Sequence, residues 1–327
     1  MAPRSGLSAQ LGISTETTYG TYVAPTTFYE LETESLAHTI ARMDVQDLRS
    51  GAFVQRTDRW AAGQHNVQGD LALSVKSNGY AKLFHHMLGA VSNIADGTGY
   101  HYTIVPGDLA GLSLTAQVGR PDLGGTVQPF SYCGLKCASW QISNTSSDQM
   151  KLKYTIDGQS ETTSQTLASP SYIANSELLF FTEGSVTVGG STLDVMNWSV
   201  TGTNAMHTNR YYISSTTPTL KREPVRNAYS NLGGTLVIDF NGLTAYNRFI
   251  NSTTAAIVLT YTGVNTYDTG KFNKIVITIP NARFEGTTPN VSGPDILQQS
   301  LPFVALDDGT NAAVQIEVYT ADVPTGV

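Results

Sequence analysis

Hydrophobic and polar residues alternate with a period of two along most of the chain. The clearest segment, residues 69–76, places three aliphatic side chains on one face and Asp70, Ser74 and Lys76 on the other. The same alternation recurs at residues 149–156, 274–279 and 314–319. Turn-forming pairs lie between such segments: Asp157-Gly158, Gly189-Gly190 and Asp308-Gly309. This pattern predicts a mainly β protein.

Only two segments have the spacing of an amphipathic helix. Residues 78–88 carry five large apolar side chains on one stripe, and Gly89 follows as a helix stop. Residues 243–250 carry a similar stripe, made of Leu243, Tyr246, Phe249 and Ile250. We therefore expect two short helices, each in a different half of the chain.

The two halves match each other when they are aligned. The strand at residues 69–73 matches residues 234–238, and at the same offset of 165 Phe84 meets Phe249. Later, residues 150–152 match residues 301–303 at an offset of 151, so the first half holds an insertion, which we place in a loop at residues 91–106. The sequence predicts two tandem related, mainly β domains, each with one helix.

The predicted boundaries follow the composition. The first domain spans residues 1–158, a Ser-, Thr- and Gln-containing linker spans 159–177, and the second domain spans 178–327. Each half also has a long polar arm between its first two strands, residues 43–66 and 206–231. Loops of this length are usually functional or disordered. The residues expected to make contacts through the arms are Arg49, Arg56, Asp58, Arg59, Trp60, Lys221, Arg222, Glu223 and Arg226.

The amino-acid composition limits the kinds of molecule that the chain is expected to bind. Only 14% of the 327 residues are charged, against roughly 25% in typical globular proteins, and the formal net charge is -7. An acidic chain does not bind nucleic acid by neutralising phosphates, so any role near DNA has to be non-adhesive. A surface with few charges suits extensive contact with neighbours. The opening residues precede no apolar run and no stretch is long enough to span a bilayer, so we expect neither a signal peptide nor membrane association.

Candidate chemistry is sparse. Cys133 and Cys137 have a spacing that predicts two reduced, buried thiols rather than a disulfide. The neighbouring His85 and His86 project in different directions and do not form a metal pair. Asp308 belongs to a turn and lacks the ligand spacing of a calcium loop. With no nucleophile elbow, phosphate loop or defensible carboxylate pair, we expect no catalysis, cofactor or metal site.

Five short motifs, taken together, resemble the major tail tube proteins of long-tailed, non-contractile (siphovirus-type) bacteriophages. They lie in the family's order and are found at residues 12–26, 56–60, 118–122, 243–249 and 291–295. The resemblance runs from about Gly12 to Tyr319, with a small departure at Tyr22. A tandem β-sandwich adhesin or receptor-binding module is the alternative, and a hydrolase on a β scaffold is the third possibility.

The resemblance implies two tandem domains of the β-sandwich or barrel type, each with one flanking helix and a long arm loop. It also implies a structural virion protein that is assembled in the host cytoplasm and located in the tail. Such proteins form rings that stack into a hollow tube for DNA ejection, with six single-domain copies or, for some duplicated members, three chains per ring. The implied partners are further copies of the chain, a tape measure protein and tail-end proteins, while DNA passes without specific binding. Polar positions on the strands before the helices are the candidates for lining the lumen, although an ordinary outer face is the alternative: Asp70, Ser74, Thr235 and Asp239.

Overall fold

The computed structural model describes residues 4–214, 216–286, 288–291 and 293–324. The helices are α1 (Ala81–Leu88) and α2 (Thr244–Ile250), with 3-10 turns η1 (Gly6–Ser8) and η2 (Phe181–Glu183). Strands of the first half are β1 (Gln10–Thr15), β2 (Thr27–Tyr29), β3 (Thr33–Glu34), β4 (Ala37–Asp44), β5 (Trp60–Ser74), β6 (Gly89–Asp96), β7 (Gly99–Pro106), β8 (Leu114–Pro121), β9 (Val127–Thr145), β10 (Lys151–Gly158) and β11 (Ser160–Thr162). Those of the second half are β12 (Gly184–Val188), β13 (Ser191–Thr192), β14 (Asn197–Thr203), β15 (Met206–His207), β16 (Val225–Arg226), β17 (Asn231–Asp239), β18 (Thr254–Asp268), β19 (Lys271–Phe284), β20 (Gln298–Ala305) and β21 (Gln315–Thr320).

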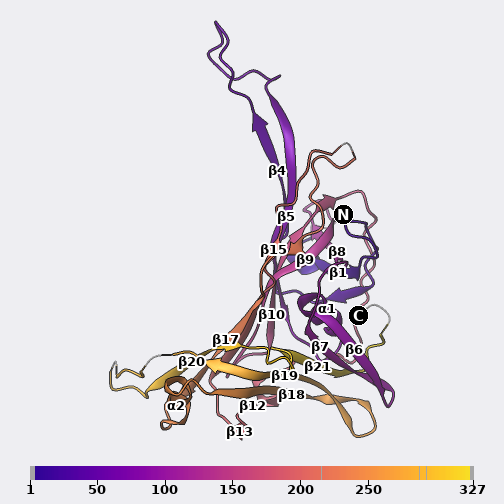
Figure 1. Ribbon diagram of the computed structural model, residues 1–327. Coiled ribbons are helices and arrows are strands. Elements are labelled where there is room, and N and C mark those ends of the chain that lie inside the picture. Colours follow the sequence, from indigo (N-terminus) through magenta and orange to yellow (C-terminus); the bar gives the residue numbers. More distant parts are fainter. Residues whose placement is uncertain (1–3, 215, 287, 292, 325–327) are drawn as a thin grey trace.

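The prediction of a mainly β protein with two short helices is confirmed (Figure 1). The observed helices begin three residues and one residue later than the predicted ones. Gly89 ends α1 in a left-handed conformation, with φ 112°, which a residue without a Cβ adopts readily. Neither described helix is long and apolar enough to cross a membrane.

One hydrogen-bonded sheet network connects the two halves of the chain. β5, β10 and β9 are neighbours in the first half, and β14, β17 and β20 are neighbours in the second. The two sets join directly because β9 pairs antiparallel with β14, from Thr145↔Asn197 to Ser139↔Thr203. The polypeptide therefore forms a single continuous sheet across this junction.

The order of pairing is the same in the two halves. In the first half it runs β2-β1-β8-β9-β10-β5-β4, and in the second it runs β13-β12-β18-β19-β20-β17-β14. In each half the helix follows the strand that stands last but one, β5 or β17.

Two glycines hold equivalent places in these series. A Cβ on Gly69 of β5 would lie 2.4 Å from the backbone oxygen of Ser35, and one on Gly234 of β17 would lie 2.0 Å from that of Ser199. Both distances are too short for any other residue type, so the close approach of the backbone at Ser35 and at Ser199 requires glycine at each site.

The residues expected to form an extra loop in the first half form a strand pair instead. β6 and β7 make a hairpin from Gly89 to Pro106, and β7 also pairs with β21 near the carboxyl end of the chain. The loop prediction was wrong: these residues pair with each other as a hairpin, and β7 also pairs with β21, where Ile104 lies opposite Ile316, far away in the sequence. The hairpin covers α1, which packs against β6, β7 and β9.

A single hydrophobic core extends through both halves and includes Leu71, Trp140, Val200, Leu236 and Ile277. Cys133 and Cys137 are buried and free, and burial raises the pKa of the Cys133 thiol to about 11. The predicted linker, residues 159–177, lies against the first half, where the side-chain amide of Gln117 bonds the backbone of Thr166 and Ala168.

Candidate assembly surfaces

The face of the sheet that points away from the core is polar across both halves. Its strand register places five polar residues side by side, one on each of β5, β10, β9, β14 and β17: Ser74, Lys151, Ser143, Ser199 and Thr235. Asp70 lies on the same face of β5, and Asp239 lies on the same face at the end of β17. All four residues predicted to line a lumen therefore share one surface, which we call the polar face.

Lys151 and Lys153 on the polar face are paired with carboxylates, whereas Asp239 at its end makes no ion pair with the described residues. Lys153 pairs with Asp70 at 3.0 Å, and Lys151 pairs with Asp148 at 2.6 Å. Partial burial opposes ionisation of Asp70, but hydrogen bonds from Thr155 and Lys153 hold the pKa of its carboxyl below the usual value. The surface therefore presents hydroxyls and compensated charges rather than a field of one sign.

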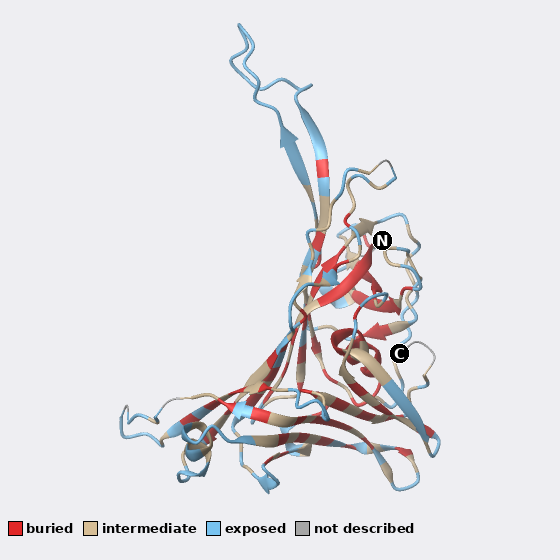
Figure 2. Ribbon diagram, in the orientation of Figure 1, coloured by how far each residue is buried: buried red, intermediate tan, exposed pale blue. Residues whose placement is uncertain are grey.

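The first arm is a β ribbon that projects far from the body of the molecule (Figure 1). The ends of β4 and β5 pair with each other, and residues 45–59 close the ribbon as a loop. Nearly the whole ribbon is solvent-exposed (Figure 2). Leu48 and Phe53 in the loop are 103% and 98% exposed. The predicted arm exists, but residues 43–44 and 60–66 of it are strand rather than loop.

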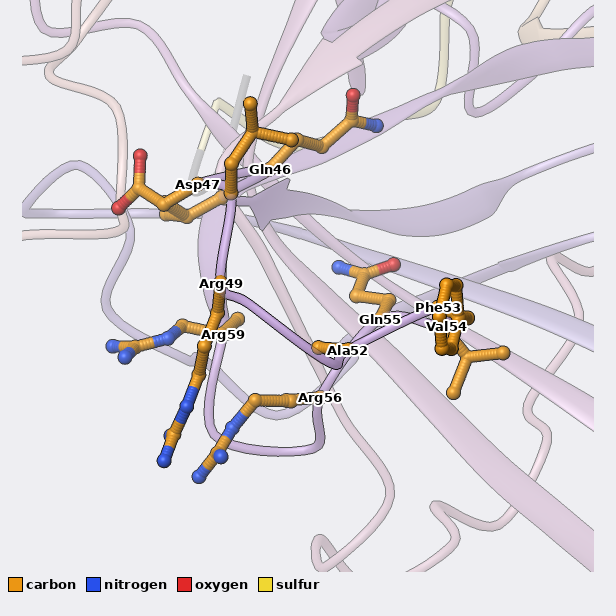
Figure 3. A pocket seen from close by; sticks show the side chains of 11 residues that line it. Gln46, Asp47, Arg49, Ala52, Phe53, Val54, Gln55, Arg56 and Arg59 are labelled. Atoms are coloured by element: carbon orange, nitrogen blue, oxygen red, sulfur yellow. The ribbon is translucent and has the colours of Figure 1, made fainter.

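The closing loop of this arm separates basic from apolar side chains. Arg49, Arg56 and Arg59 extend to one side of it, whereas Phe53 and Val54 lie on the other (Figure 3). Arg56 is bound by Asp58 at 2.9 Å, while the guanidinium groups of Arg49 and Arg59 make no hydrogen bond or ion pair with the described residues. The loop encloses a space of about 590 Å³ lined only by its own residues, so the space is a fold of the arm rather than a site in the body.

The second arm lies against the first half of the chain. The Lys221 ammonium is 2.6 Å from Asp157 and 2.7 Å from Asn66, and its side chain is 1% exposed. Burial lowers the pKa of Lys221, although Asp157 opposes the shift. Glu223 is bound in turn by the buried ammonium of Lys136.

Lys221 and Glu223, two of the residues expected to make contacts through the arms, form ion pairs with the first half of their own chain. A buried charge needs a partner: the buried ammonium of Lys221 is paired with Asp157, and the buried ammonium of Lys136 is paired with Glu223. Arg222 stays exposed and Arg226 is half-buried in β16. Tyr212 and Ile213, near the tip of this arm, are also exposed.

A family model described as "Phage tail tube protein" matches residues 6–305, which is nearly the whole chain. The chain belongs to the phage tail tube protein family. The resemblance to tail tube proteins that the five motifs carry is thereby confirmed, and the protein is a structural component of the virion tail. No curated protein matches the sequence.

The buried polar groups of this tail tube protein serve its fold. The Glu16 carboxylate accepts hydrogen bonds from the backbone of Gly20 and Gly134 and from the hydroxyls of Ser113 and Thr115. Burial raises its pKa in spite of these donors. Among the described residues no group of three or more His, Cys, Asp or Glu side chains has a metal-binding arrangement.

His86, Asp308 and the Asp157-Gly158 pair, which the sequence analysis singled out, all have structural roles in the tail tube protein. His86 is buried beside Thr15, and burial lowers its pKa to about 3. Asp308 accepts hydrogen bonds from the backbone of Thr310 and Asn311, so the predicted turn is confirmed. Asp157-Gly158 was wrongly predicted as a turn, because both residues continue β10 and pair with β5.

Sequence analysis missed Lys136, Asn66 and Asp157 as the residues that hold the second arm of the tail tube protein. No local signal marks them, since each lies far from its partner in sequence. The nearest, Asp157, is 64 residues from Lys221.

Proposed function

We propose that three copies of this chain close into a ring and that the rings stack into the tail tube of a long-tailed, non-contractile phage, through which DNA is ejected. The observation that carries this proposal is the junction of β9 with β14, because it joins the two halves into one sheet with one polar face. A repeat of that junction from chain to chain would close the sheet into a ring.

The proposal takes the chain as two copies of one building unit. The identical order of strand pairing and the equivalent glycines, Gly69 and Gly234, support this duplication. Three chains with two units each supply the six units of a pseudo-sixfold ring. Ring closure by rotation needs a contact that differs on its two sides, and each chain offers a first-half side and a second-half side.

The first half has a strand edge at β4 that no other described strand pairs with. The equivalent strand of the second half, β14, uses that edge to pair with another strand of the same chain. β14 pairs on one side with β17 and on the other with β9. β4, which stands in the position of β14 in the pairing order, pairs with β5 on one side alone among the described strands. An unpaired edge accepts a further strand through backbone hydrogen bonds, here from the neighbouring chain.

In this arrangement the polar face lines the lumen. Asp70, Ser74 and Thr235 then face the DNA, and Asp239 lies at the end of the strand. Because the Lys153–Asp70 and Lys151–Asp148 pairs leave little net charge, phosphates are neither held nor strongly repelled. A tape measure protein inside the tube, tail-end proteins at its ends and links between rings through the exposed first arm complete the proposed set of partners.

Electron microscopy of the concentrated protein, combined with site-specific labelling, tests this function. The native cysteines are buried, so Thr235→Cys and, as a matched control, Leu123→Cys in the exposed β8–β9 turn provide single reactive thiols. We expect tubes in which a 5-kDa maleimide polymer labels position 123 but no longer labels position 235, whereas unassembled chains react at both. Dispersed monomers at high concentration would favour the adhesin alternative, and tubes labelled equally at both positions would place the polar face outside.

A further inference from the structure

A groove lined by both apolar and polar side chains lies beside α2, in the second half of the chain. It has a volume of about 630 Å³ and passes between α2 and residues 191–196. The apolar side chains that line it are Val188, Leu193, Val195, Met196, Ile238 and Ala245.

Comparison of the two helices shows why this groove is open. Seven of the eight residues of α1 are buried, because the β6–β7 hairpin and β9 cover it. None of the residues of α2 is buried; Leu243, which precedes the helix, and Ile250, its last residue, are 58% and 54% exposed. The second half has no hairpin between α2 and β18 that would cover the helix. The chain thus holds one covered helix and one uncovered helix.

The groove lies at the end of the sheet opposite to the arms. Thr203 of β14 and Asn231 of β17 pair at the end where the second arm leaves the sheet. At the other end, Met196 and Asp239 line the groove. Figure 1 shows the first arm and α2 at opposite ends of the molecule.

We propose that this groove receives the loop of the first arm, residues 45–59, from a second copy of the chain in the adjacent ring. The inference rests on the proposed function, since it requires rings that stack. Phe53 and Val54 supply apolar side chains that have no contact to bury them in their own chain, and the groove supplies apolar walls. Burying such surface is the main driving force of protein association.

Charges on the two surfaces are complementary as well. Arg49 and Arg59 lie on the basic side of the arm loop without a partner (Figure 3). Asp194 and Asp239 line the groove, and neither makes an ion pair or side-chain hydrogen bond within the described residues. Arg248, the cation of the groove, is directed to the backbone oxygen of Val188 and to the ring of Phe284. Opposite charges on the two surfaces set the register of docking.

The numbers of arms and grooves also agree. Each chain has one projecting arm and one uncovered helix, so a ring of any size offers as many grooves to the ring on one side as it extends arms to the ring on the other. A head-to-tail contact of this kind does not close, and it extends without limit along one axis. It gives the stack a direction.

Cross-linking in assembled tubes tests the docking. Phe53→Cys and Thr192→Cys in the same chain place one thiol on the arm and one in the groove, and a short bismaleimide joins them only if they meet. We expect a ladder of linked chains that continues beyond trimers on a denaturing gel. The matched pair Phe53→Cys and Leu123→Cys should remain monomeric.

The outcomes separate the two proposals. If tubes form but the 53–192 pair stays unlinked, or if the ladder ends at trimers, the proposed docking is wrong while the proposed tube is unaffected. Absence of tubes from the wild-type protein would overturn the proposed function, and the docking with it.

A charge exchange gives an independent readout. The double variant Asp194→Arg/Asp239→Arg and the double variant Arg49→Asp/Arg59→Asp should each reduce tube mass by at least about tenfold, the effect of about 1.4 kcal/mol at the contact. The quadruple variant should restore it. Asp295→Arg, a change at an exposed acid outside the groove, serves as the control. A quadruple variant no better than either double variant, with melting temperatures unchanged, would contradict the pairing.

Discussion

The two arms of this tail tube protein have similar length and polarity in sequence, but only the second lies against the body of the molecule. The first arm projects as an exposed ribbon whose side chains contact almost nothing outside it. The second is held on the first half by Lys221 and Glu223, whose partners Asp157 and Lys136 come from the body. The comparison indicates that an arm is held against the body where its charged side chains form buried ion pairs with residues of the body, and projects into solvent where they do not.

The largest expected effect separates the arms by function. Replacing residues 45–59 with an Asn-Gly turn should abolish tube elongation and leave the melting temperature unchanged, because the removed loop contributes no buried contact to the body. Electron microscopy and thermal unfolding measure the two quantities. Long tubes from this variant would show that the first arm does not link rings.

A point change in each arm should separate them by stability. Lys221→Ala leaves the Asp157 carboxylate buried without its cation, which costs about 3–5 kcal/mol of unfolding free energy. The matched change in the first arm, Arg59→Ala, should alter stability by less than about 0.5 kcal/mol. Urea denaturation of the two variants provides the comparison. Equal effects would contradict the distinction between a fixed and a free arm.

A milder change should loosen the second arm. Glu223→Gln removes the charge that faces Lys136 but keeps an acceptor, and the ammonium retains the backbone oxygen of Leu109 at 2.7 Å. We expect a loss of about 1–2 kcal/mol by urea denaturation. Arg222→Ala, at an exposed neighbouring position, is the control and should change little. A neutral Glu223→Gln variant would mean that the ion pair is not what holds this arm.

The smallest effect concerns pH at the base of the arms. His65 contacts His38 at 3.1 Å and its backbone bonds the second arm, through Thr219 and Tyr211. Burial, with repulsion from His38 and Arg42, lowers the pKa of His65. The folded state therefore binds a proton less readily than the unfolded state, and stability falls as pH drops below about 6.5.

Hydrogen exchange should report this as faster exchange, corrected for its intrinsic rate, at residues 209–220 at pH 5.5 than at pH 7.5. The first arm loop should already exchange freely at both values. In His65→Gln the difference should shrink. An equal pH dependence in wild type and variant would assign the effect to other groups.

Short-range features of the fold were predictable from sequence. The alternation at residues 69–76 and the apolar stripe at residues 78–88 identify β5 and α1, because each pattern is complete within a few residues. The exposed first arm was also predictable, since its residues have no apolar periodicity. The polar positions Ser74 and Thr235 follow from the same alternation that predicts their buried neighbours.

Long-range features were not predictable. Lys221 can be buried because Asp157 and Asn66 bind its ammonium group, and these residues are 64 and 155 positions away in the sequence. The pairing of β7 with β21 likewise joins residues that are far apart in the sequence, such as Ile104 and Ile316. Strand matching by pattern alone also tolerates even shifts of register: under the proposed duplication, Leu73 opposes Leu152 while its counterpart Ile238 opposes Gln299, so the offset there is 147 and not 151.

A cryo-electron microscopy class average of a tube, viewed along its axis, tests the central claim most directly. The account predicts three chains per ring, six sheet units in pseudo-sixfold arrangement, and a closed inner wall formed by the polar face with Ser143, Ser199 and Thr235 toward the axis. A ring of six chains, or an inner wall formed by the helices with the polar face outside, would contradict it.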